Sequence, residues 1–278
     1  MPELPEVEIA ARGLRRWLVG RSVVEVGVHD VKVVRRKLST LPSDAVEDGA
    51  GALRADWLGR RVSEVRRVGK RMALVGNGPR ALLVHLGMSG KWVTRDAEVS
   101  VKHGRVALTL DDGQVVWFVD PRRFGCVIPV DRDDVDTALA KGLGPDALDT
   151  PLAANELQER MQTRSAIKVA LMDQQRLAGL GNIHAVEALW RAGVDPRRAS
   201  SSLDAAEWRA LARRIPEQLQ WTLDHEGDGE MNYINEAGVD NPFAVYAREG
   251  EPCRRCGDAI ARVVQSGRST FWCPGCQA

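Results

Sequence analysis

The sequence has no apolar run long enough to cross a lipid bilayer, because its longest uninterrupted apolar stretches have the length of β-strands. It also lacks the basic and then apolar start of a signal peptide, and has Glu3 and Glu6 there instead. We therefore expect a cytoplasmic protein that does not bind membranes. The formal net charge is only +1, so bulk charge does not indicate a nucleic-acid partner, and any such partner would be recognised by local clusters.

Cysteine is scarce, with five residues in 278, and four of them fall in the last 26 residues. Cys253 and Cys256 form one CxxC pair, and Cys273 and Cys276 form a second, with 16 residues between the pairs. This spacing is typical of a zinc ribbon, in which four thiolates hold one structural Zn²⁺ and leave no open position for water. Two disulfides are the alternative, which a reducing cytoplasm disfavours. Cys126 stands in an apolar stretch and is expected to be a small core residue.

The first half of the chain has the pattern of short β-strands between Val23 and Val130. Apolar runs at 81–84 and 114–119 indicate buried strands, and Asp111-Asp112-Gly113 indicates a hairpin turn. An amphipathic stretch from about Val7 to Leu18 precedes them. We predict a β-sandwich or barrel with one N-terminal helix.

Residues 131–144 are polar and acidic, which fits a linker or a surface helix followed by a turn. From Pro151 to His225 apolar residues recur at helical spacing, as in Trp208, Leu211 and Ile215. Residues 227–238 are rich in glycine and polar residues, and we interpret them as a mobile loop. The predicted fold is α+β, with domains at residues 1–131, 151–244 and 245–278 and a linker at 132–150.

The N-terminal residues could carry chemistry. Removal of Met1 is expected before a small residue and would leave Pro2 with a free secondary amine. A terminal amine titrates nearer neutrality than a lysine, so part of it is nucleophilic at cellular pH. Glu3 and Glu6 would supply carboxylates for proton transfer. On composition alone, a stiff chain start with acidic residues at a helix N-terminus explains the same residues.

Five motifs change this balance. They occur in the order Pro2–Glu8 (PELPEVE), His85–Gly90 (HLGMSG), Asp120–Gly125 (DPRRFG), Ala178–Ile183 (AGLGNI) and Gln265–Phe271 (QSGRSTF). Together they resemble the formamidopyrimidine-DNA glycosylases, the bifunctional bacterial enzymes that remove oxidised purines from damaged double-stranded DNA. The resemblance covers nearly the whole chain. It implies a β-sandwich with an N-terminal helix, followed by an all-helical helix-two-turn-helix domain with a C-terminal zinc ribbon.

The resemblance also implies residue roles. Pro2 would be the nucleophile, Glu3 the general acid/base and Glu6 a supporting carboxylate, while Lys70 would contact phosphate and assist elimination. The residues implied to bind DNA are His85, Met88, Arg122, Phe124, Asn182 and Arg268. Of these, Met88, Arg122 and Phe124 would fill the gap left by the flipped nucleotide, and Asn182 and Arg268 would clamp phosphates. We expect a monomer acting in base-excision repair.

These roles agree with general chemistry. A base inside a duplex must be extruded before it is attacked, and apolar or guanidinium groups can fill the hole that it leaves. The alternative is that Met88 and Phe124 are core residues, as a Met and a Phe near turns more often are, and that Arg122 forms a surface salt bridge. Asn182 follows a glycine-rich stretch and is predicted to cap a helix whose free amides face a phosphate. Arg268 is expected at a hairpin tip. The basic stretch of Arg60, Arg61, Arg66, Arg67, Lys70 and Arg71 is either a solvated strand face or a track for the DNA backbone.

Three departures from the family concern the lesion pocket. Gln175 stands where the family commonly has a lysine, with Arg176 next to it as the candidate substitute, and His184 stands in place of the usual tyrosine. The segment from Glu226 to Phe243 is shorter than the family's lesion-covering loop. Two rival hypotheses remain: an oxidised-pyrimidine glycosylase resembling the endonuclease VIII branch, and a damaged-DNA-binding protein without catalysis. Intact Pro2 and Glu3 argue against the second.

Overall fold

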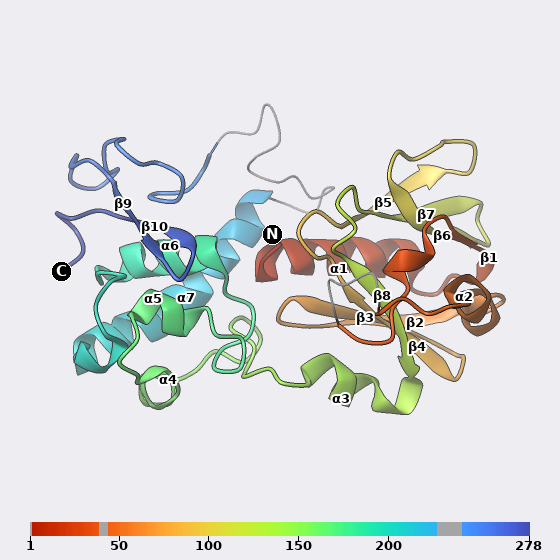
Figure 1. Cartoon of the computed structure of the whole chain (residues 1–278), viewed down its shortest axis with the longest axis horizontal. Coiled ribbons are helices and arrows are strands. Elements are labelled where there is room, and N and C mark those ends of the chain that lie inside the picture. Colours follow the sequence, from red (N-terminus) through yellow and green to blue (C-terminus); the bar gives the residue numbers. More distant parts are fainter. Residues whose placement is uncertain (1, 39–43, 227–240) are drawn as a thin grey trace. The chain divides into compact units, whose positions relative to one another are not determined.

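The computed structural model describes residues 2–38, 44–226 and 241–278, which fall into two compact units. The first unit contains Pro2, most of residues 6–141 and Glu226. The second contains Glu3–Pro5, Gly142–His225 and residues 241–278. Each unit is described by itself, and Figure 1 labels its elements.

The first unit is a β-sandwich of two four-stranded antiparallel sheets, with strand orders β1-β6-β7-β5 and β2-β3-β4-β8. Strands β4 and β7 are buried along most of their length, as the apolar runs at 81–84 and 114–119 predicted. The predicted hairpin is confirmed, because Gly113 has a φ of +85° in the turn between β6 and β7. The strands are β1 (Val23–Val28), β2 (Val62–Val68), β3 (Arg71–Gly76), β4 (Arg80–His85), β5 (Lys91–Asp96), β6 (Gly104–Leu110), β7 (Gln114–Val119) and β8 (Cys126–Asp131).

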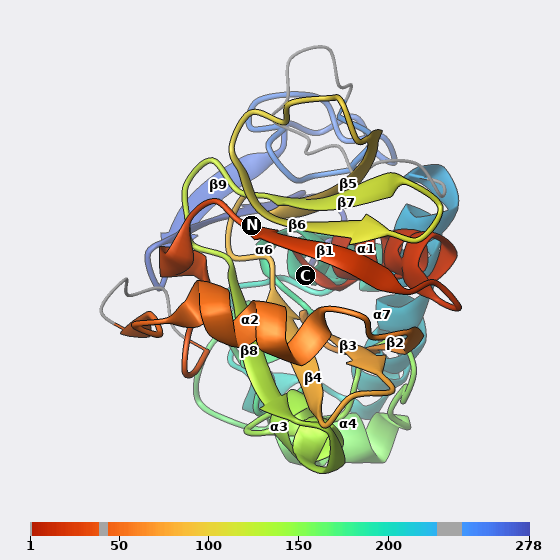
Figure 2. The same ribbon diagram turned by 90° about the vertical axis from the view of Figure 1, so that its right-hand side faces the viewer.

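The predicted N-terminal helix is confirmed and begins three residues earlier than expected, because α1 spans Leu4–Leu18. Leu4, Val7, Ala11, Leu14 and Leu18 recur at spacings of three and four, and all have no exposed surface. This apolar stripe is what anchors the helix. A second helix, α2 (Gly49–Trp57), covers one end of the sandwich, at the front in Figure 2.

The acidic stretch after β8 forms a short surface helix. A 3₁₀ turn, η3 (Arg132–Asp134), leads into α3 (Val135–Ala140). Val135 and Leu139 pack on residues of the β2-β3-β4-β8 sheet, in a cluster that includes Cys126. Cys126 is therefore the small core residue that the sequence predicted. A further 3₁₀ turn, η1 (Val31–Val33), follows β1.

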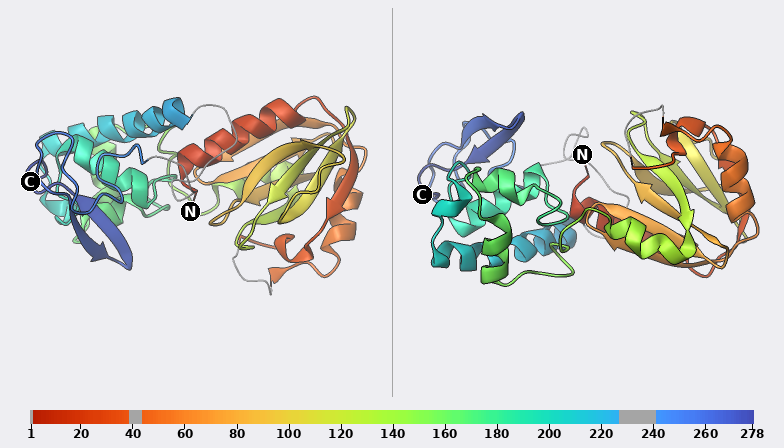
Figure 3. Two further views of the ribbon diagram at one scale, coloured as in Figure 1. Left: turned by 90° about the horizontal axis from the view of Figure 1, so that it is seen from above. Right: turned by 60° about the horizontal axis from the view of Figure 1, so that its bottom comes forward.

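The second unit is helical and carries a C-terminal β-hairpin (Figure 3). Its apolar core includes Leu171, Leu189, Trp208 and Leu211, in agreement with the predicted helical periodicity. The predicted mobile loop at 227–238 lies outside the described residues. No helix in the described parts of the chain is long and apolar enough to cross a membrane. The elements are α4 (Ala154–Met161), α5 (Ile167–Leu171), α6 (Asn182–Ala192), η4 (Ser200–Ser202), α7 (Ala205–Glu226), β9 (Ala261–Gln265) and β10 (Arg268–Trp272).

The predicted fold class is confirmed: an α+β chain with an N-terminal β-sandwich and helix, a helical domain and a C-terminal four-cysteine finger. The finger packs on α6 through a small apolar cluster in which Val186 meets Val245, Ile260 and Phe271. The position of the β9–β10 hairpin relative to α6 is thus set by apolar packing.

Candidate nucleic-acid interface and catalytic groups

The four C-terminal cysteines come together as predicted. Their sulfur atoms all lie within 4.8 Å of one another, with Cys253 Sγ 3.9 Å from Cys276 Sγ and Cys256 Sγ 3.3 Å from Cys273 Sγ. Four sulfurs around a tetrahedral zinc lie about 3.8 Å apart, given a Zn–S bond of about 2.3 Å. The donor set therefore fits one structural Zn²⁺ held by four thiolates.

The finger presents Arg268 at the tip of a hairpin. Gln265 pairs with Arg268 across β9 and β10, and the turn residues Ser266 and Gly267 have φ values of +48° and +73°. Arg268 is exposed, so its guanidinium is available to an anion such as a DNA phosphate. The predicted hairpin-tip location is confirmed, whereas the phosphate contact stays a prediction.

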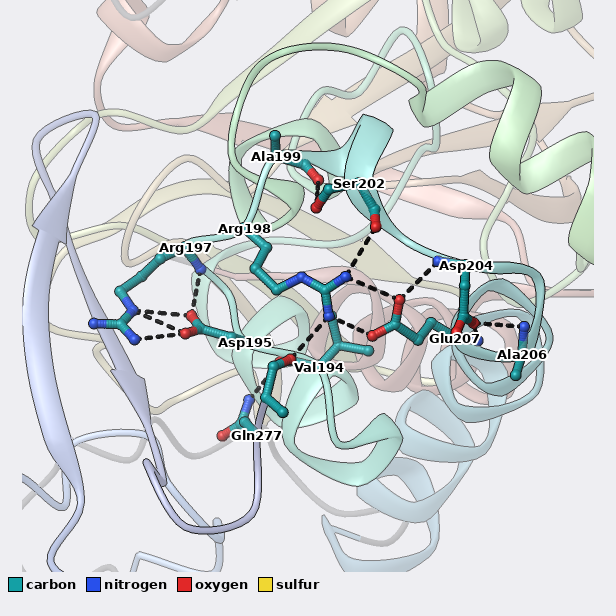
Figure 4. A network of polar contacts seen from close by, with 11 residues as sticks. Val194, Asp195, Arg197, Arg198, Ala199, Ser202, Asp204, Ala206, Glu207 and Gln277 are labelled. Carbon is teal, nitrogen blue, oxygen red and sulfur yellow. Dashed lines mark hydrogen bonds and ion pairs between the residues drawn. The ribbon is translucent and has the colours of Figure 1, made fainter.

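The finger is tied to the helical part of the same unit by its last residues (Figure 4). Gln277 is 3% exposed, donates from Nε2 to the carbonyl of Val194 at 2.7 Å and accepts the amide of Cys273 at 2.9 Å. Arg198 donates to the carbonyl of Ala278 at 3.0 Å. One buried amide thus joins a metal-binding knuckle to the loop that follows α6.

The N-terminus of α6 is occupied by a carboxylate of the same chain. Glu3 is 2% exposed, and its two oxygens accept the amides of Gly181 at 2.8 Å, Ile183 at 2.8 Å and His184 at 3.1 Å. Backbone amides at a helix N-terminus stabilise negative charge. This finding corrects the expectation that these amides are free to face a phosphate.

Asn182 is not the helix cap, which is a second correction. Gly181 occupies the cap position and Asn182 is the first residue of α6. The reason is that Glu3 supplies the capping oxygens from 178 residues away. The Asn182 amide instead donates to the Ser269 carbonyl at 2.9 Å. It therefore joins the start of α6 to the hairpin that bears Arg268.

Two glycines make room for the N-terminal segment. A Cβ on Gly179, whose φ is +114°, would lie 2.3 Å from Leu4 Cδ1, and a Cβ on Gly181 would lie 2.3 Å from the carboxyl carbon of Glu3. The Leu4 amide also donates to the Gly179 carbonyl at 3.1 Å. The AGLGNI motif thus serves close approach of the chain start.

Lys168 is a candidate functional residue that the sequence reasoning missed. It lies in α5, is only 1% exposed, and lines an open cavity of about 260 Å³ together with residues of the finger hairpin. Burial and the charge of Arg268 lower its pKa to about 8, although Glu3 opposes this shift. A lysine inside the apolar run Ile167–Leu171 was the available signal, since buried ammonium groups are costly. The lining residues are Lys168, Val169, Met172, Asp173, Gln265, Ser266 and Arg268.

In the first unit, Asp120 organises the loop that bears two of the predicted gap-filling residues. Asp120 is fully buried; its Oδ2 accepts the Gly125 amide at 2.7 Å, and its Oδ1 accepts the Arg122 amide at 3.2 Å and the Ser89 hydroxyl at 2.8 Å. The bond to Ser89 connects this loop to the one that bears Met88. Sequence reasoning identified the motif but not the role of its first residue.

The three predicted gap-filling residues have the exposure that a wedge needs. Met88 is 39% exposed, Arg122 is exposed, and Phe124 is half-buried with the Arg122 guanidinium 4.9 Å from its ring centroid. Gly87 has a φ of +66°, and a Cβ there would lie 2.3 Å from the Gly125 amide nitrogen. The two loops therefore pack in direct contact, and their insertion into DNA stays a prediction.

His85 is held in one tautomer. Its Nδ1 accepts the Gly87 amide at 3.0 Å, which leaves the proton on Nε2. Removal from water, together with the charges of Arg71, Lys70 and Arg35, lowers the pKa of His85 to about 4. His85 is thus a neutral Nε2–H donor at cellular pH, suited to hydrogen-bond a phosphate oxygen.

The basic stretch of β2 and β3 is divided by the fold. Arg66 pairs with Glu64 and Asp136, and Arg71 donates to the Leu139 and Lys141 carbonyls. The Arg67 side chain is only 1% exposed, so the expectation that the whole stretch could track DNA is wrong for this residue. Half-buried Lys70 lies in the two-residue turn between the strands.

Pro2 and Glu6 are both buried in the first unit. Glu226, a carboxylate that sequence reasoning also missed, belongs to the same unit. Burial and the negative charge of Glu6 raise the pKa of Glu226 to about 8, so this carboxyl group keeps its proton at neutral pH.

The departures from the family have structural consequences. Gln175 is exposed, and Arg176 is bound to Asp173 and to the Arg160 carbonyl, so Arg176 already has partners within the fold. His184 is fully buried, with its ring edge-on to Phe243 at 5.9 Å. Most of the short segment between Glu226 and Phe243 lies outside the described residues.

A β-sandwich with two contacting loops that bear the predicted gap-filling residues, a helical unit and a zinc finger with an exposed arginine are the features of a zinc-finger DNA-binding protein, here with candidate catalytic groups at its N-terminus. Comparisons with known proteins specify the family. Residues 1–127 match the formamidopyrimidine-DNA glycosylase N-terminal domain, 143–232 match its H2TH domain, and 250–278 match the zinc finger found in FPG and IleRS.

Full-length relatives agree. The chain is 37% identical to formamidopyrimidine-DNA glycosylase of Herpetosiphon aurantiacus, with all of both chains covered, and 38% identical to that of Mycolicibacterium paratuberculosis, with 100% of this chain and 98% of the relative covered. It is similar to MutM in complex with DNA containing carbocyclic 8-oxo-G (TM-score 0.85, 28% identity, all of both chains covered). It is also similar to Lactococcus lactis FPG in complex with DNA containing FAPY-dG (TM-score 0.84, 28% identity, 99% of each chain covered). The chain belongs to the formamidopyrimidine-DNA glycosylase family.

Proposed function

We propose that this chain flips oxidised or ring-opened purines out of double-stranded DNA, excises them through its N-terminal proline and then nicks the strand. The observation that carries the proposal is the position of Glu3, whose carboxylate is fixed by three amides directly beside Pro2 in the sequence. A protein that only binds DNA needs neither a terminal secondary amine nor a buried carboxylate next to it.

In the first step, the unprotonated Pro2 nitrogen attacks C1′ of the damaged nucleotide. The glycosidic bond breaks, its electron pair leaves with the base, and the base takes up a proton. The nitrogen then loses its proton, the C1′–O4′ bond breaks with its electron pair on O4′, and O4′ takes up a proton as the sugar ring opens, which gives an iminium ion. The negative charge of Glu3, held by the α6 amides, stabilises this cation and can take part in proton transfer.

In the second step, the iminium ion serves as the electron sink. Loss of a C2′ proton breaks the C3′–O bond, and the phosphate leaves with the electron pair. Loss of a C4′ proton then allows the C5′–O bond to break in the same way. Lys70 contacts the departing phosphates. Its charge helps to lower the pKa of His85, and the neutral His85 can donate a further hydrogen bond to a phosphate.

In this proposal the DNA is bound by side chains of both units. Met88, Arg122 and Phe124 fill the gap, with Arg122 able to hydrogen-bond the orphaned base. Asn182 and Arg268, joined through Ser269, bind phosphates of the damaged strand. These contacts fix the register while base flipping provides access.

Borohydride trapping tests the chemistry. Incubation with abasic DNA and borohydride should give a covalent complex whose crosslink maps to Pro2 by peptide analysis. Pro2→Gly should trap poorly, and chains that retain Met1 should not trap. A crosslink that maps only to a lysine would refute the assignment, and no crosslink at all would support the rival damaged-DNA-binding protein.

A panel of duplexes, each with one defined lesion, tests the substrate. We expect formamidopyrimidine lesions to be excised faster than 8-oxoguanine, because Gln175, His184 and the short 226–243 segment change the groups available to recognise an intact oxidised base. An oxidised pyrimidine belongs in the panel, since Lactococcus lactis FPG has been crystallised with DNA containing one. Preference for that pyrimidine would favour the endonuclease VIII-like alternative.

A further inference from the structure

One buried ion pair in the first unit is not explained by the proposed function. Glu8, on α1, accepts hydrogen bonds from Arg12 Nε at 3.2 Å, Arg15 Nη1 at 2.9 Å and Arg67 Nε at 2.8 Å. The Arg67 side chain is 1% exposed and that of Glu8 is 12% exposed. Burying a guanidinium in this way costs free energy that apolar packing would not.

Charge neutralisation does not account for Arg67. Glu8 already has Arg12 and Arg15 on its own helix, and both are much more exposed than Arg67. Besides its bond to Glu8, Arg67 donates a hydrogen bond from its Nη1 to the Gly69 carbonyl at 3.1 Å. One rigid guanidinium therefore joins α1 to the turn between β2 and β3.

That turn carries Lys70. Val68 pairs with Arg71, so Gly69 and Lys70 form a two-residue hairpin loop, and Gly69 has a φ of +56°. A glycine with positive φ at the first loop position is typical of a tight hairpin turn. The Arg67 bond to the Gly69 carbonyl fixes the peptide that joins the two loop residues, and thus the direction in which Lys70 leaves the backbone.

We propose that Glu8 and Arg67 are a positioning pair that holds the Lys70 turn against helix α1, the helix that directly follows Pro2 and Glu3. This inference rests on the proposed function of Lys70 and Pro2. Glu8 lies four residues beyond the first helical residue, Leu4, which is about 6 Å along the helix axis. The pair thereby links the turn of Lys70, which is proposed to assist elimination, to the helix that follows the proposed nucleophile, and a displacement of about 1 Å at a reacting group can cost about 100-fold in rate.

The variant Arg67→Met tests the pair in the full-length, zinc-loaded protein. It removes the hydrogen bonds from Arg67 to Glu8 and to the Gly69 carbonyl, keeps an unbranched apolar stem and leaves Glu8 with Arg12 and Arg15. We expect single-turnover elimination at a preformed abasic site to slow by about 10- to 100-fold, while equilibrium affinity for the same duplex changes less than about threefold. Arg66→Met is the matched control: it removes the same charge from the adjacent residue, whose partners are Glu64 and Asp136, and should keep its elimination rate within about twofold.

A double-mutant cycle with Lys70→Ala separates positioning from a general structural effect. If Arg67 acts through Lys70, Arg67→Met/Lys70→Ala should be no slower than Lys70→Ala alone. Rate losses that multiply would overturn the inference. If Lys70→Ala loses rate but Arg67→Met behaves like Arg66→Met, the pair is refuted and the proposed role of Lys70 stands; if Lys70→Ala loses no rate, the proposed role of Lys70 itself fails.

A second variant keeps the test decisive if Arg67→Met does not fold. Arg67→Lys retains a charge for Glu8 but lacks the forked guanidinium that reaches two acceptors in fixed directions. It should fold, bind zinc and DNA normally, and lose elimination rate. Full elimination rate in Arg67→Lys would show that the geometry of the pair does not matter.

Discussion

Replacing Lys168 by methionine should stabilise the folded protein while impairing its function. Lys168 is 1% exposed, and burial together with Arg268 lowers its pKa from 10.5 to about 8. A lowered lysine pKa means that the charged form is less favourable in the folded state than in the unfolded state. Methionine keeps an unbranched chain of similar volume and removes the charge.

The magnitude follows from the shift. A difference of two to three pKa units corresponds to about 3 kcal/mol, at about 1.4 kcal/mol per unit. Below pH 8 the lysine is charged in both states, so the folded state bears the full cost. As pH rises from about 8 to 10.5, the folded protein loses the proton before the unfolded chain does, and the cost disappears. Lys168→Met should therefore raise the free energy of unfolding by up to about 3 kcal/mol at pH 7, with little difference near pH 10.5.

Urea unfolding followed by tryptophan fluorescence at pH 7, 8.5 and 10 measures this difference. Lys102→Met, at an exposed position of the first unit, is the control and should change stability by less than about 0.5 kcal/mol. In parallel, Lys168→Met should bind lesion DNA more weakly, because an ammonium beside Arg268 is lost from the cavity. A variant less stable than the parent at pH 7, or a stability difference that does not depend on pH, would refute the reasoning.

Three further predictions address the grip and the chemistry. In a single-turnover assay, Asp120→Ala should slow base excision by about tenfold or more, because three hydrogen bonds that order the loops bearing Met88 and Arg122 are lost. Asp112→Ala, in an exposed hairpin turn, is the control and should leave the excision rate unchanged in the same assay. Chelation should release one zinc per chain and weaken DNA binding, and full affinity in metal-free Cys253→Ser would contradict this dependence of binding on zinc. Arg268→Ala should lower the salt dependence of binding by about one ion. Glu3→Gln should slow excision about 100-fold with DNA affinity nearly intact, and equal losses of both would show that Glu3 is a folding residue only.

Local signals in the sequence predicted the fold well. Short apolar runs indicated the buried strands, the Asp111–Gly113 turn indicated a hairpin, and two CxxC pairs indicated the zinc site. Each of these depends on residues close together in the chain, or on a ligand geometry that spacing alone restricts. Arg268 at the hairpin tip was predictable for the same reason.

What the sequence could not supply was the pairing of distant polar groups. Arg67 looked like one member of a basic strand face, yet it is buried because Glu8, 59 residues away, accepts its hydrogen bond. Lys168 was not singled out from the sequence, because the finger hairpin that lines the same cavity comes about 100 residues later in the chain. A cation's availability to DNA depends on these tertiary partners, which no local pattern encodes.

The start of α6 shows why this matters for function. A helix N-terminus preceded by glycines has the amides of an anion site, and the sequence alone favours an external phosphate. In the structure Gly181, Ile183 and His184 bind the carboxylate of Glu3 instead. The side chain of Asn182, a proposed phosphate clamp, lies beside that site and is bound to the Arg268 hairpin through Ser269. The same helix end therefore orients the proposed catalytic carboxylate and one of the proposed phosphate clamps, so a change that shifts α6 should disturb excision and binding together, whereas Glu3→Gln should separate them.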